Sequence, residues 1–197
     1  DPIKTFEQKI VWVKGMKGSE RRLAFIRGDL NATRENPAAY KKHVLPVIEK
    51  GDAYTWFHHG LLDVSTGQHG KDPNFTEPTF EALYESTYGV APGGDFYDAY
   101  KLVKSWRDAL QKAFWVNKDN PNKEKLVAAL DKMINDPESV AAIEKKVGKY
   151  EWRTGSDGDA AVRTLKSFIT PKALKTLANF KSKQLGYNTV YKEELTE

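Results

Sequence analysis

The chain has 197 residues, of which 40% are apolar and 29% charged, a composition that argues against disorder and suits one domain or two small lobes. It has no cysteine, which excludes disulfides and thiolate chemistry, and no apolar run approaches the roughly 18–20 residues that span a membrane. The net charge of +4 favours anionic solutes or acidic partners. Because the lysines are spread along the chain, we do not expect nucleic-acid binding.

The N-terminus gives little information about localisation. No signal peptide is visible, so a leader is either absent or already removed. The chain begins at Asp1–Pro2 without an initiator methionine, from which we expect a processed or truncated product. The lack of cysteine fits a protein of the cell envelope as well as a cytosolic one.

The first predicted strand and helix lie near the N-terminus. The stretch at 10–13 is apolar and β-rich, and it predicts a strand. A short helix follows, in which Ser19 is the expected N-cap and Gly28 the expected stop. The chain therefore turns from a strand into a helix at residues 17–19.

A second strand-to-helix turn follows. A short strand is expected to end at 33–36, where Asn36 and Pro37 form the cap and first position of another helix. Pro46 is expected to kink or restart that helix. The aromatic and β-branched stretch 53–58 then predicts a third strand.

The middle of the chain mixes loop, helix and strand. The Gly-punctuated stretch 59–78 predicts a long irregular loop. Thr79 is the expected cap of a short helix, and a turn at 90–94 leads to a further helix at 96–105. Residues 109–116 predict a strand, because the stretch is apolar toward its end.

From residue 120 the chain predicts helices whose starts are marked by a polar residue followed by proline. These starts are Asn120–Pro121, Asp136–Pro137 and Thr170–Pro171. Another helix is expected to carry Ala161, Leu165 and Phe168. The expected helix ends are Gly148 and Gly186, and residues 150–153 are expected to be extended. We therefore predict an α/β fold with a mixed sheet, in which residues 1–116 form an α/β lobe and residues 117–197 a helical C-terminal region.

The two strand-to-helix turns are the candidate binding site. The candidate residues are Lys17, Gly18 and Ser19 in the first turn and Thr33, Arg34 and Asn36 in the second. Unpaired N–H groups and the positive end of the dipole at a helix N-terminus attract a carboxylate, and hydroxyl, guanidinium and amide groups add donors. In open α/β sheets, ligands lie at such carboxyl ends of strands. The alternative is ordinary helix capping, with Arg34 paired to Glu35 or another acid.

Other site chemistries have little support in the sequence. The spacing of the histidines, which are His43, His58, His59 and His69, fits no standard zinc pattern, and adjacent histidines on a strand would point to opposite faces. Nucleophile-elbow, phosphate-loop and dinucleotide-binding motifs are absent from the sequence. We therefore expect neither a metal, nor a cofactor, nor an enzyme.

A set of motifs in the same order resembles one known family. Residues 11–19 read VWVKGMKGS and residues 23–32 read LAFIRGDLNA; PVIEKG follows at 46–51, EPTFEALY at 77–84, FWV at 114–116 before Asn120–Pro121, and MINDPE at 133–138. From about residue 9 to 147 the chain thereby resembles the extracytoplasmic solute receptors of tripartite tricarboxylate transporters, the Bug/TctC-like proteins.

The resemblance implies a periplasmic, non-catalytic protein with the fold of a periplasmic-binding-protein lobe, which binds a small carboxylate for a membrane transporter. It implies that the chain corresponds to the C-terminal two thirds of such a receptor, a second lobe with its helical return to the first. Lys17, Gly18 and Ser19 would form one second-lobe binding turn, and Thr33, Arg34 and Asn36 would lie close to the other.

The family's first-lobe binding segment has no counterpart in the sequence. The chain is therefore expected to be either a fragment of a longer receptor or a shortened relative with another task. In the second case we expect an accessory subunit docked on a larger envelope or membrane protein complex. The aromatic-rich segments 54–57 and 97–106 would then furnish the interface.

Overall fold

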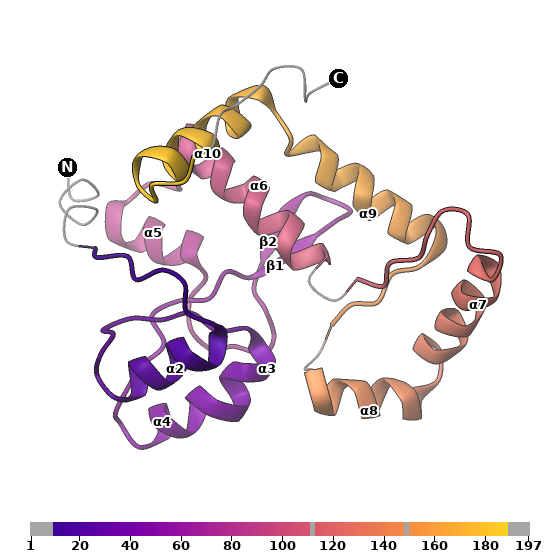
Figure 1. Cartoon of the computed structure of the whole chain (residues 1–197), viewed down its shortest axis with the longest axis horizontal. Coiled ribbons are helices and arrows are strands. Elements are labelled where there is room, and N and C mark those ends of the chain that lie inside the picture. Colours follow the sequence, from indigo (N-terminus) through magenta and orange to yellow (C-terminus); the bar gives the residue numbers. More distant parts are fainter. Residues whose placement is uncertain (1–9, 111–112, 148–149, 189–197) are drawn as a thin grey trace. The chain divides into compact units, whose positions relative to one another are not determined.

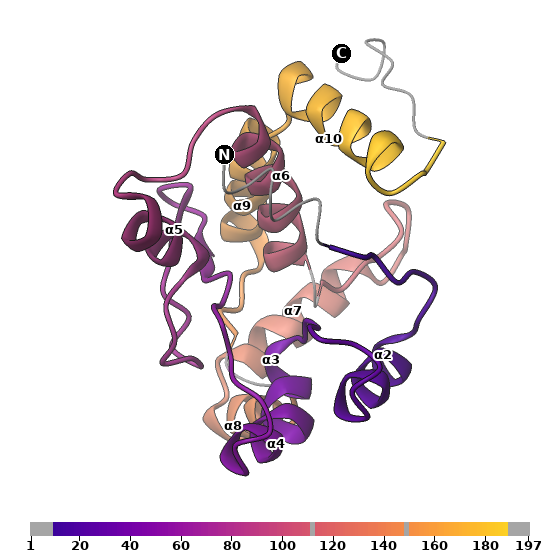
Figure 2. The same ribbon diagram turned by 90° about the vertical axis from the view of Figure 1, so that its left-hand side faces the viewer.

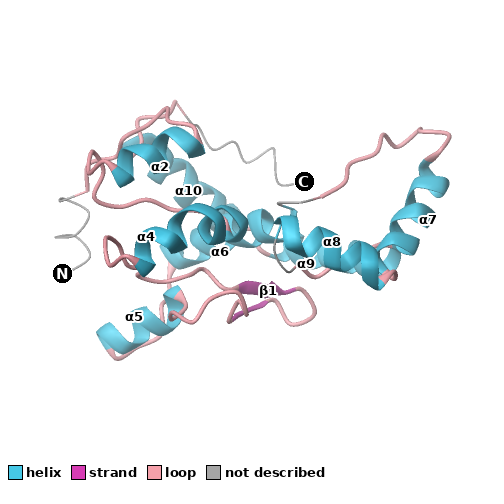
Figure 3. Ribbon diagram, turned by 90° about the horizontal axis from the view of Figure 1, so that it is seen from below, coloured by secondary structure: helices cyan, strands magenta, loops and turns pink. Residues whose placement is uncertain are grey.

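The computed structural model describes residues 10–110, 113–147 and 150–188, and the chain divides into two compact units, Asp1–Ala53 and Tyr54–Glu197. Helices dominate the described residues, and the described strands form one antiparallel pair (Figures 1 and 3). The fold is therefore mixed α/β in the broad sense. The sequence predicts a mixed sheet, and the described ranges do not contain one.

The boundary between the units lies at residue 53, before the expected boundary at 116. The expected boundary separates an α/β lobe from a helical C-terminal region, and it stays a prediction. Among the described helices, none is both long and apolar enough to cross a lipid bilayer.

The first unit is built from short helices. They are α2 (Gly18–Ile26), α3 (Pro37–Ala39), the π-helix η1 (Tyr40–Val44) and α4 (Leu45–Glu49). The N-cap of α2 is Lys17, so the prediction of Ser19 as the cap is wrong, and Ser19 lies in the first turn instead. Gly28 follows α2 with φ +83°, a conformation that glycine adopts without strain, which confirms the predicted stop.

The start of α3 and the break before α4 follow the sequence. The Oδ1 of Asn36 accepts a 3.0 Å hydrogen bond from the N–H of Ala39, and Pro37 is the first helical residue, as predicted. Pro46 lies in the first turn of α4, directly after the π-helix. A proline ring clashes with the carbonyl group four residues earlier, which for Pro46 is the carbonyl of Lys42. Lys42 lies in the π-helix, so the wider helical turn is found at the point of this clash.

The two strands predicted in this unit are not formed. Residues 10–13 and 32–36 lie outside regular structure, and Val11 is 86% exposed. A strand needs a neighbour that pairs its backbone N–H and C=O groups. The described part of this unit contains no such neighbour, so strand-like composition alone does not produce a sheet.

The second unit is built around a long central helix, α6. Its elements are β1 (Leu61–Asp63), β2 (Gln68–Gly70), α5 (Phe80–Tyr88), α6 (Asp95–Leu110), α7 (Lys123–Ile134), α8 (Pro137–Val147), α9 (Gly155–Ser167) and α10 (Pro171–Lys183). Helix α6 packs on α10, on α9 and on β1, and α7 packs on α8. Figure 1 shows α6 between α10 and the hairpin.

The long loop predicted at 59–78 is wrong in part, because it contains the β1–β2 hairpin. Leu61 pairs with Gly70 and Asp63 with Gln68. The carbonyl of Asp63 accepts a 2.7 Å hydrogen bond from the N–H of Gly67, whose φ of +70° closes the turn.

Two further predicted strands are also wrong. Residues 53–58 are irregular except for one parallel bridge between His58 and Thr79. Helix α6 extends through Leu110 because its apolar positions continue at helical spacing, and residues 113–116 are irregular. Residues 111–112 of that predicted strand lie outside the described residues.

Helix starts are the most accurate predictions in this unit. The Oγ1 atoms of Thr79 and Thr170 each accept a 3.1 Å hydrogen bond from an N–H three residues later, which confirms both caps. Asp136 accepts a 3.0 Å bond from the N–H of Ser139 at the start of α8, whereas α7 begins at Lys123, two residues after the expected Asn120–Pro121 start. The predicted stop at Gly148 lies outside the described residues.

The apolar core of this unit lies between the hairpin, α6 and α9. It contains Leu62, Val64, Ala161 and the fully buried Leu165, with Trp106, Leu110 and Phe168 packed against it. The hydroxyl of Thr164 donates a 2.6 Å hydrogen bond to the carbonyl of Val64. This bond joins α9 to the turn between β1 and β2.

Candidate anion-binding site

The first candidate turn lies at the N-terminus of α2. Lys17 has an extended backbone (φ −67°, ψ 161°), and its N–H donates a 2.9 Å hydrogen bond to the Oε2 atom of Glu20. Lys17, Gly18 and Ser19 are exposed. Since the first amides of an α-helix have no acceptor within the helix, this end of α2 presents N–H groups and a positive dipole to solvent. The carboxylate of Glu20 already lies at this turn.

The second candidate turn runs through residues 33–36. The Oδ1 of Asn36 caps α3, so that oxygen serves the fold, and Thr33 is half-buried while Arg34 is exposed. Helices α3, η1 and α4 follow one another without a gap from Pro37 to Glu49, so this turn leads into one continuous helical stretch. It therefore offers side-chain groups next to a second helix N-terminus, at which the N–H of Ala39 is already bonded to Asn36.

Arg21 brings the two turns together. Its Nε donates a 3.0 Å hydrogen bond to Oγ1 of Thr33, and its Nη2 donates a 2.8 Å bond to the carbonyl of Arg34. The N–H of Arg21 bonds to the carbonyl of Lys17, so Arg21 lies one helical turn from Lys17 on the same face of α2. In Figure 2, α2 and α3 can be followed within this unit.

A neighbouring ion pair reinforces this connection. Nε of Arg22 lies 3.1 Å from Oε1 of Glu35, and the two side chains are only 16% and 6% exposed. Charged pairs that are largely removed from water hold their geometry better than exposed ones. Glu35 therefore pairs with Arg22, while the alternative interpretation of the sequence paired Arg34 with Glu35 or another acid.

The net positive charge of the chain comes from this unit. Residues 1–53 contain 11 of the 31 Lys and Arg residues and 7 of the 27 Asp and Glu residues, which accounts for the whole net charge of +4. The remaining residues contain 20 of each sign, so the second unit is neutral. A positive unit attracts anions over several ångströms of solvent.

Arg21 connects the two candidate turns, and the sequence analysis did not single it out. It lies in the middle of a helix rather than at its end, and mid-helix arginines are mostly solvated. The available signal was its spacing, four residues after Lys17, which places both residues on one face of the helix. Among the other candidates, Lys17 and Asn36 are N-caps, Gly18 and Ser19 lie in the first turn of α2, and Thr33 and Arg34 lie in the irregular segment before α3.

Three of the four histidines lie within hydrogen-bonding distance of other groups. Nδ1 of the buried His58 accepts a 2.9 Å hydrogen bond from the N–H of Gly60. Nδ1 of His59 lies 2.8 Å from the hydroxyl of Tyr100, and Nε2 of His69 lies 3.3 Å from Oγ of Ser105. Across the described ranges, no three His, Asp or Glu side chains are grouped as metal ligands would be.

Comparisons with known proteins give no relative. No protein-family model, no curated protein and no solved structure matches this chain.

Proposed function

We propose that the chain binds a small carboxylate, without transforming it, where the N-terminus of α2 meets the turn at 33–36. The observation that carries this proposal is the pair of hydrogen bonds from Arg21 to Thr33 and to the carbonyl of Arg34. These bonds hold two groups of anion-binding residues together in the unit that has the positive charge. Residues 17–19 and 33–36 are far apart in the sequence, and these bonds bring them close together in the structure.

In this proposal each residue has a distinct role. The N–H groups of Gly18 and Ser19 and the Ser19 hydroxyl donate to the ligand carboxylate, while Lys17 and Arg34 neutralise its charge. Arg21 orients Thr33 and adds a further positive charge. Glu20 competes with the ligand, because its carboxylate already accepts the Lys17 N–H.

The biological setting that we propose is that of a periplasmic solute receptor. The resemblance to the receptors of tripartite tricarboxylate transporters supports a receptor-type lobe, a carboxylate ligand and a membrane transporter as partner. In such a receptor the first lobe would cover the ligand and exclude water.

Thermal unfolding in the presence of carboxylates tests the proposal. A ligand that binds only the folded state raises the free energy of unfolding by about 2.7 kcal/mol at a concentration one hundred times its Kd, and the melting temperature rises with it. Acetate, succinate and citrate should be compared with chloride at equal ionic strength. A higher melting temperature with a carboxylate supports the proposal, and equal values in all four salts contradict it.

A second candidate function is docking on a larger envelope protein complex. The observation that favours it is the exposure of large apolar side chains, among them Tyr54 at 83% and Trp115 at 79%. Within the second predicted interface segment, Tyr97 and Tyr100 are instead half-buried in a group of packed rings. Size-exclusion chromatography of native material separates the two candidates, because a lone monomer supports solute capture and co-migration with a large complex supports docking.

A further inference from the structure

The second unit is neutral as a whole, but its charges are unevenly distributed. Residues 160–188, which contain most of α9 and all of α10, have six Lys and Arg residues and no Asp or Glu. Because the unit has 20 residues of each sign, the rest of it has 14 basic and 20 acidic residues. The net charge of zero therefore conceals a strongly positive stretch.

Helix α10 presents lysines on one face. Lys172, Lys175 and Lys183 are exposed, and the period of 3.6 residues places all three within about a quarter of the circumference of the helix. Ala173 and Ala178, on the other side of α10, are only 1% and 7% exposed. Since α10 packs on α6, the buried side already has a partner within the unit, and the lysine face points to solvent.

Helix α9 continues this positive surface. Arg163 and Lys166 are exposed and lie three residues apart on one face, whereas Ala161 and Leu165 belong to the apolar core. Residues 168–170 join α9 to α10, and both helices pack on α6 (Figure 1). We call the exposed cations of the two helices the basic surface, and its members are Arg163, Lys166, Lys172, Lys175 and Lys183.

Acidic side chains offset little of this charge. Among residues 10–110, 113–147 and 150–188, one member of the basic surface forms an ion pair, in which Nζ of Lys172 lies 2.7 Å from Oδ1 of Asp95. The two side chains are 70% and 50% exposed, so water weakens their attraction. The acidic residues of α9, Asp157 and Asp159, both precede Arg163 in the helix. The surface therefore keeps most of its positive charge.

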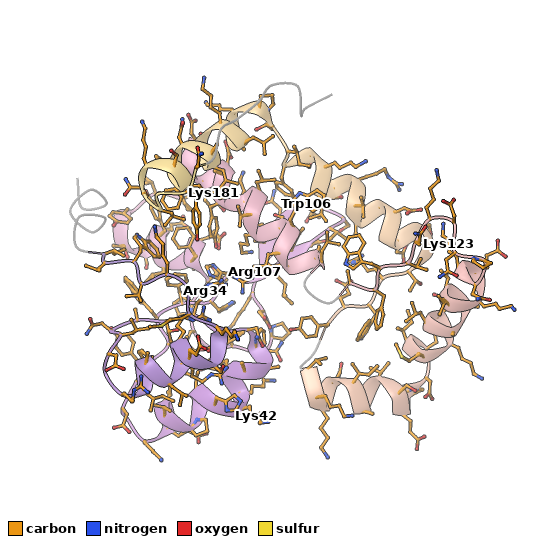
Figure 4. All side chains as sticks on the ribbon, viewed as in Figure 1. Arg34, Lys42, Trp106, Arg107, Lys123 and Lys181 are labelled. Atoms are coloured by element: carbon orange, nitrogen blue, oxygen red, sulfur yellow. The ribbon has the colours of Figure 1, made fainter. Side chains whose placement is uncertain are left out.

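Exposed apolar side chains lie next to these cations in the chain. Ile169, between α9 and α10, is 37% exposed, and Tyr187, after the end of α10, is 50% exposed. The N–H of Tyr187 donates a 3.0 Å hydrogen bond to the carbonyl of Lys181, whose Nζ lies 5.9 Å from the centre of the tyrosine ring. Figure 4 labels Lys181 on α10. Tyr187 is thus held at the C-terminal end of the helix.

The side chains of the surface distinguish between anionic partners. Four of its five cations are lysines, which act as hydrated point charges, whereas the planar fork of arginine suits the recognition of nucleic-acid phosphates. Ile169 and Tyr187 have no acceptor or donor to match in a phosphate backbone, but aliphatic and tyrosine side chains are stabilised in the headgroup region of a bilayer. Each lysine close to an anionic bilayer raises the affinity roughly fivefold.

We propose that the basic surface of α9 and α10 docks on an anionic lipid bilayer, with Ile169 and Tyr187 at the level of the headgroups. The lysine face of α10 then lies along the bilayer, and the attraction is electrostatic and reversible. The proposal does not depend on the carboxylate site, which lies in the other unit.

Co-sedimentation of the full chain with lipid vesicles tests this docking. Vesicles of phosphatidylcholine and phosphatidylglycerol in equal amounts should bind the chain, vesicles of phosphatidylcholine alone should not, and added sodium chloride should weaken the binding. The double variant Lys175→Gln/Lys183→Gln should bind the mixed vesicles roughly ten- to thirtyfold more weakly, as expected for two lost lysines. Because both lysines are exposed, its melting temperature should stay close to that of the unmodified chain.

The matched control is Lys123→Gln/Lys125→Gln, which removes two exposed lysines from α7 in the same unit (Lys123 is labelled in Figure 4). This variant should bind the mixed vesicles nearly as tightly as the unmodified chain. The proposal is overturned if the mixed vesicles do not bind, or if both double variants lose affinity equally, which would mean that net charge alone attracts the chain. It is also overturned if duplex DNA binds more tightly than the mixed vesicles and is lost in Lys175→Gln/Lys183→Gln. None of these results bears on carboxylate binding by the first unit.

Discussion

The guanidinium of Arg21 and the hydroxyl of Thr33 are joined by a 3.0 Å hydrogen bond across twelve residues of sequence. A second bond, 2.8 Å long, runs from the same guanidinium to the carbonyl of Arg34. One planar side chain thus fixes the position of the second turn against α2. The proposed carboxylate site depends on this geometry as well as on charge.

Replacing Arg21 by lysine should separate geometry from charge. A lysine keeps the positive charge but lacks the planar fork that reaches two acceptors. We expect Arg21→Lys to weaken succinate binding roughly three- to tenfold in isothermal titration calorimetry, as expected for about one lost hydrogen bond. Arg27→Lys is the control, because Arg27 pairs only locally with the exposed Asp29. Succinate binding by Arg21→Lys as tight as by Arg27→Lys and the unmodified chain would show that Arg21 acts through charge alone.

Replacing Glu20 by glutamine should strengthen binding. The Glu20 carboxylate accepts the Lys17 N–H and thereby competes with a bound carboxylate. We expect a roughly twofold to tenfold tighter Kd for succinate in Glu20→Gln. Glu49→Gln changes the net charge of the unit equally at an exposed position in α4, so it should change affinity much less. An effect of the same size in both variants would mean that only net charge matters.

Gly60 and Gly67 provide a matched test of the hairpin. Both have positive φ, +72° and +70°, but a Cβ on Gly60 would lie 2.2 Å from the carbonyl oxygen of Gly70, whereas a Cβ on Gly67 meets nothing closer than 3.7 Å. Gly67→Ala should lower the free energy of unfolding by about 1–2 kcal/mol, the cost of the left-handed conformation. Gly60→Ala should lose a further 1–3 kcal/mol or so from the overlap. Urea unfolding measures both, and equal losses would contradict the hairpin geometry.

His69 should make the second unit less stable in acid. Burial lowers the pKa of His69 to about 4, and the positive charges of Lys104 and Lys101 lower it as well, from a usual value of 6.5. Between these two pH values the unfolded chain binds a proton that the folded chain does not, so the free energy of unfolding falls as the pH falls.

His69→Gln removes this contribution and should reduce the loss between pH 7 and pH 4.5 by about 1 kcal/mol, which allows for the partial exposure of the side chain. His43→Gln, at an exposed position in η1, is the control and should follow the unmodified chain. Urea unfolding at both pH values checks the difference. A loss in His69→Gln as large as in the unmodified chain would contradict this origin.

Helix ends could be predicted from the sequence because their signals are local. Asn36, Thr79 and Thr170 each cap a helix through an N–H only three residues away, so the four residues involved determine the result. Gly28 ends α2 for a similar reason. These positions needed no knowledge of the rest of the fold.

Strands could not be predicted in the same way, because a strand is stable only beside another. Residues 10–13 and 113–116 have strand-like composition, yet they lie outside regular structure. The hairpin was missed for the opposite reason, since Gly67 was interpreted as part of a long loop rather than as its turn. Arg21 was missed because its hydrogen bonds reach residues twelve and thirteen positions away.

The most direct test of the central claim is a ¹H–¹⁵N NMR titration of the full chain with succinate. We predict saturable shifts of the amide signals of residues 17–20 and of Thr33, Arg34 and Asn36, with the signals of residues 54–188 unchanged. Chloride at the same ionic strength should leave all these signals in place. The absence of shifts in residues 17–20, or saturable shifts confined to the second unit, would contradict the claim that the joined turns bind a carboxylate.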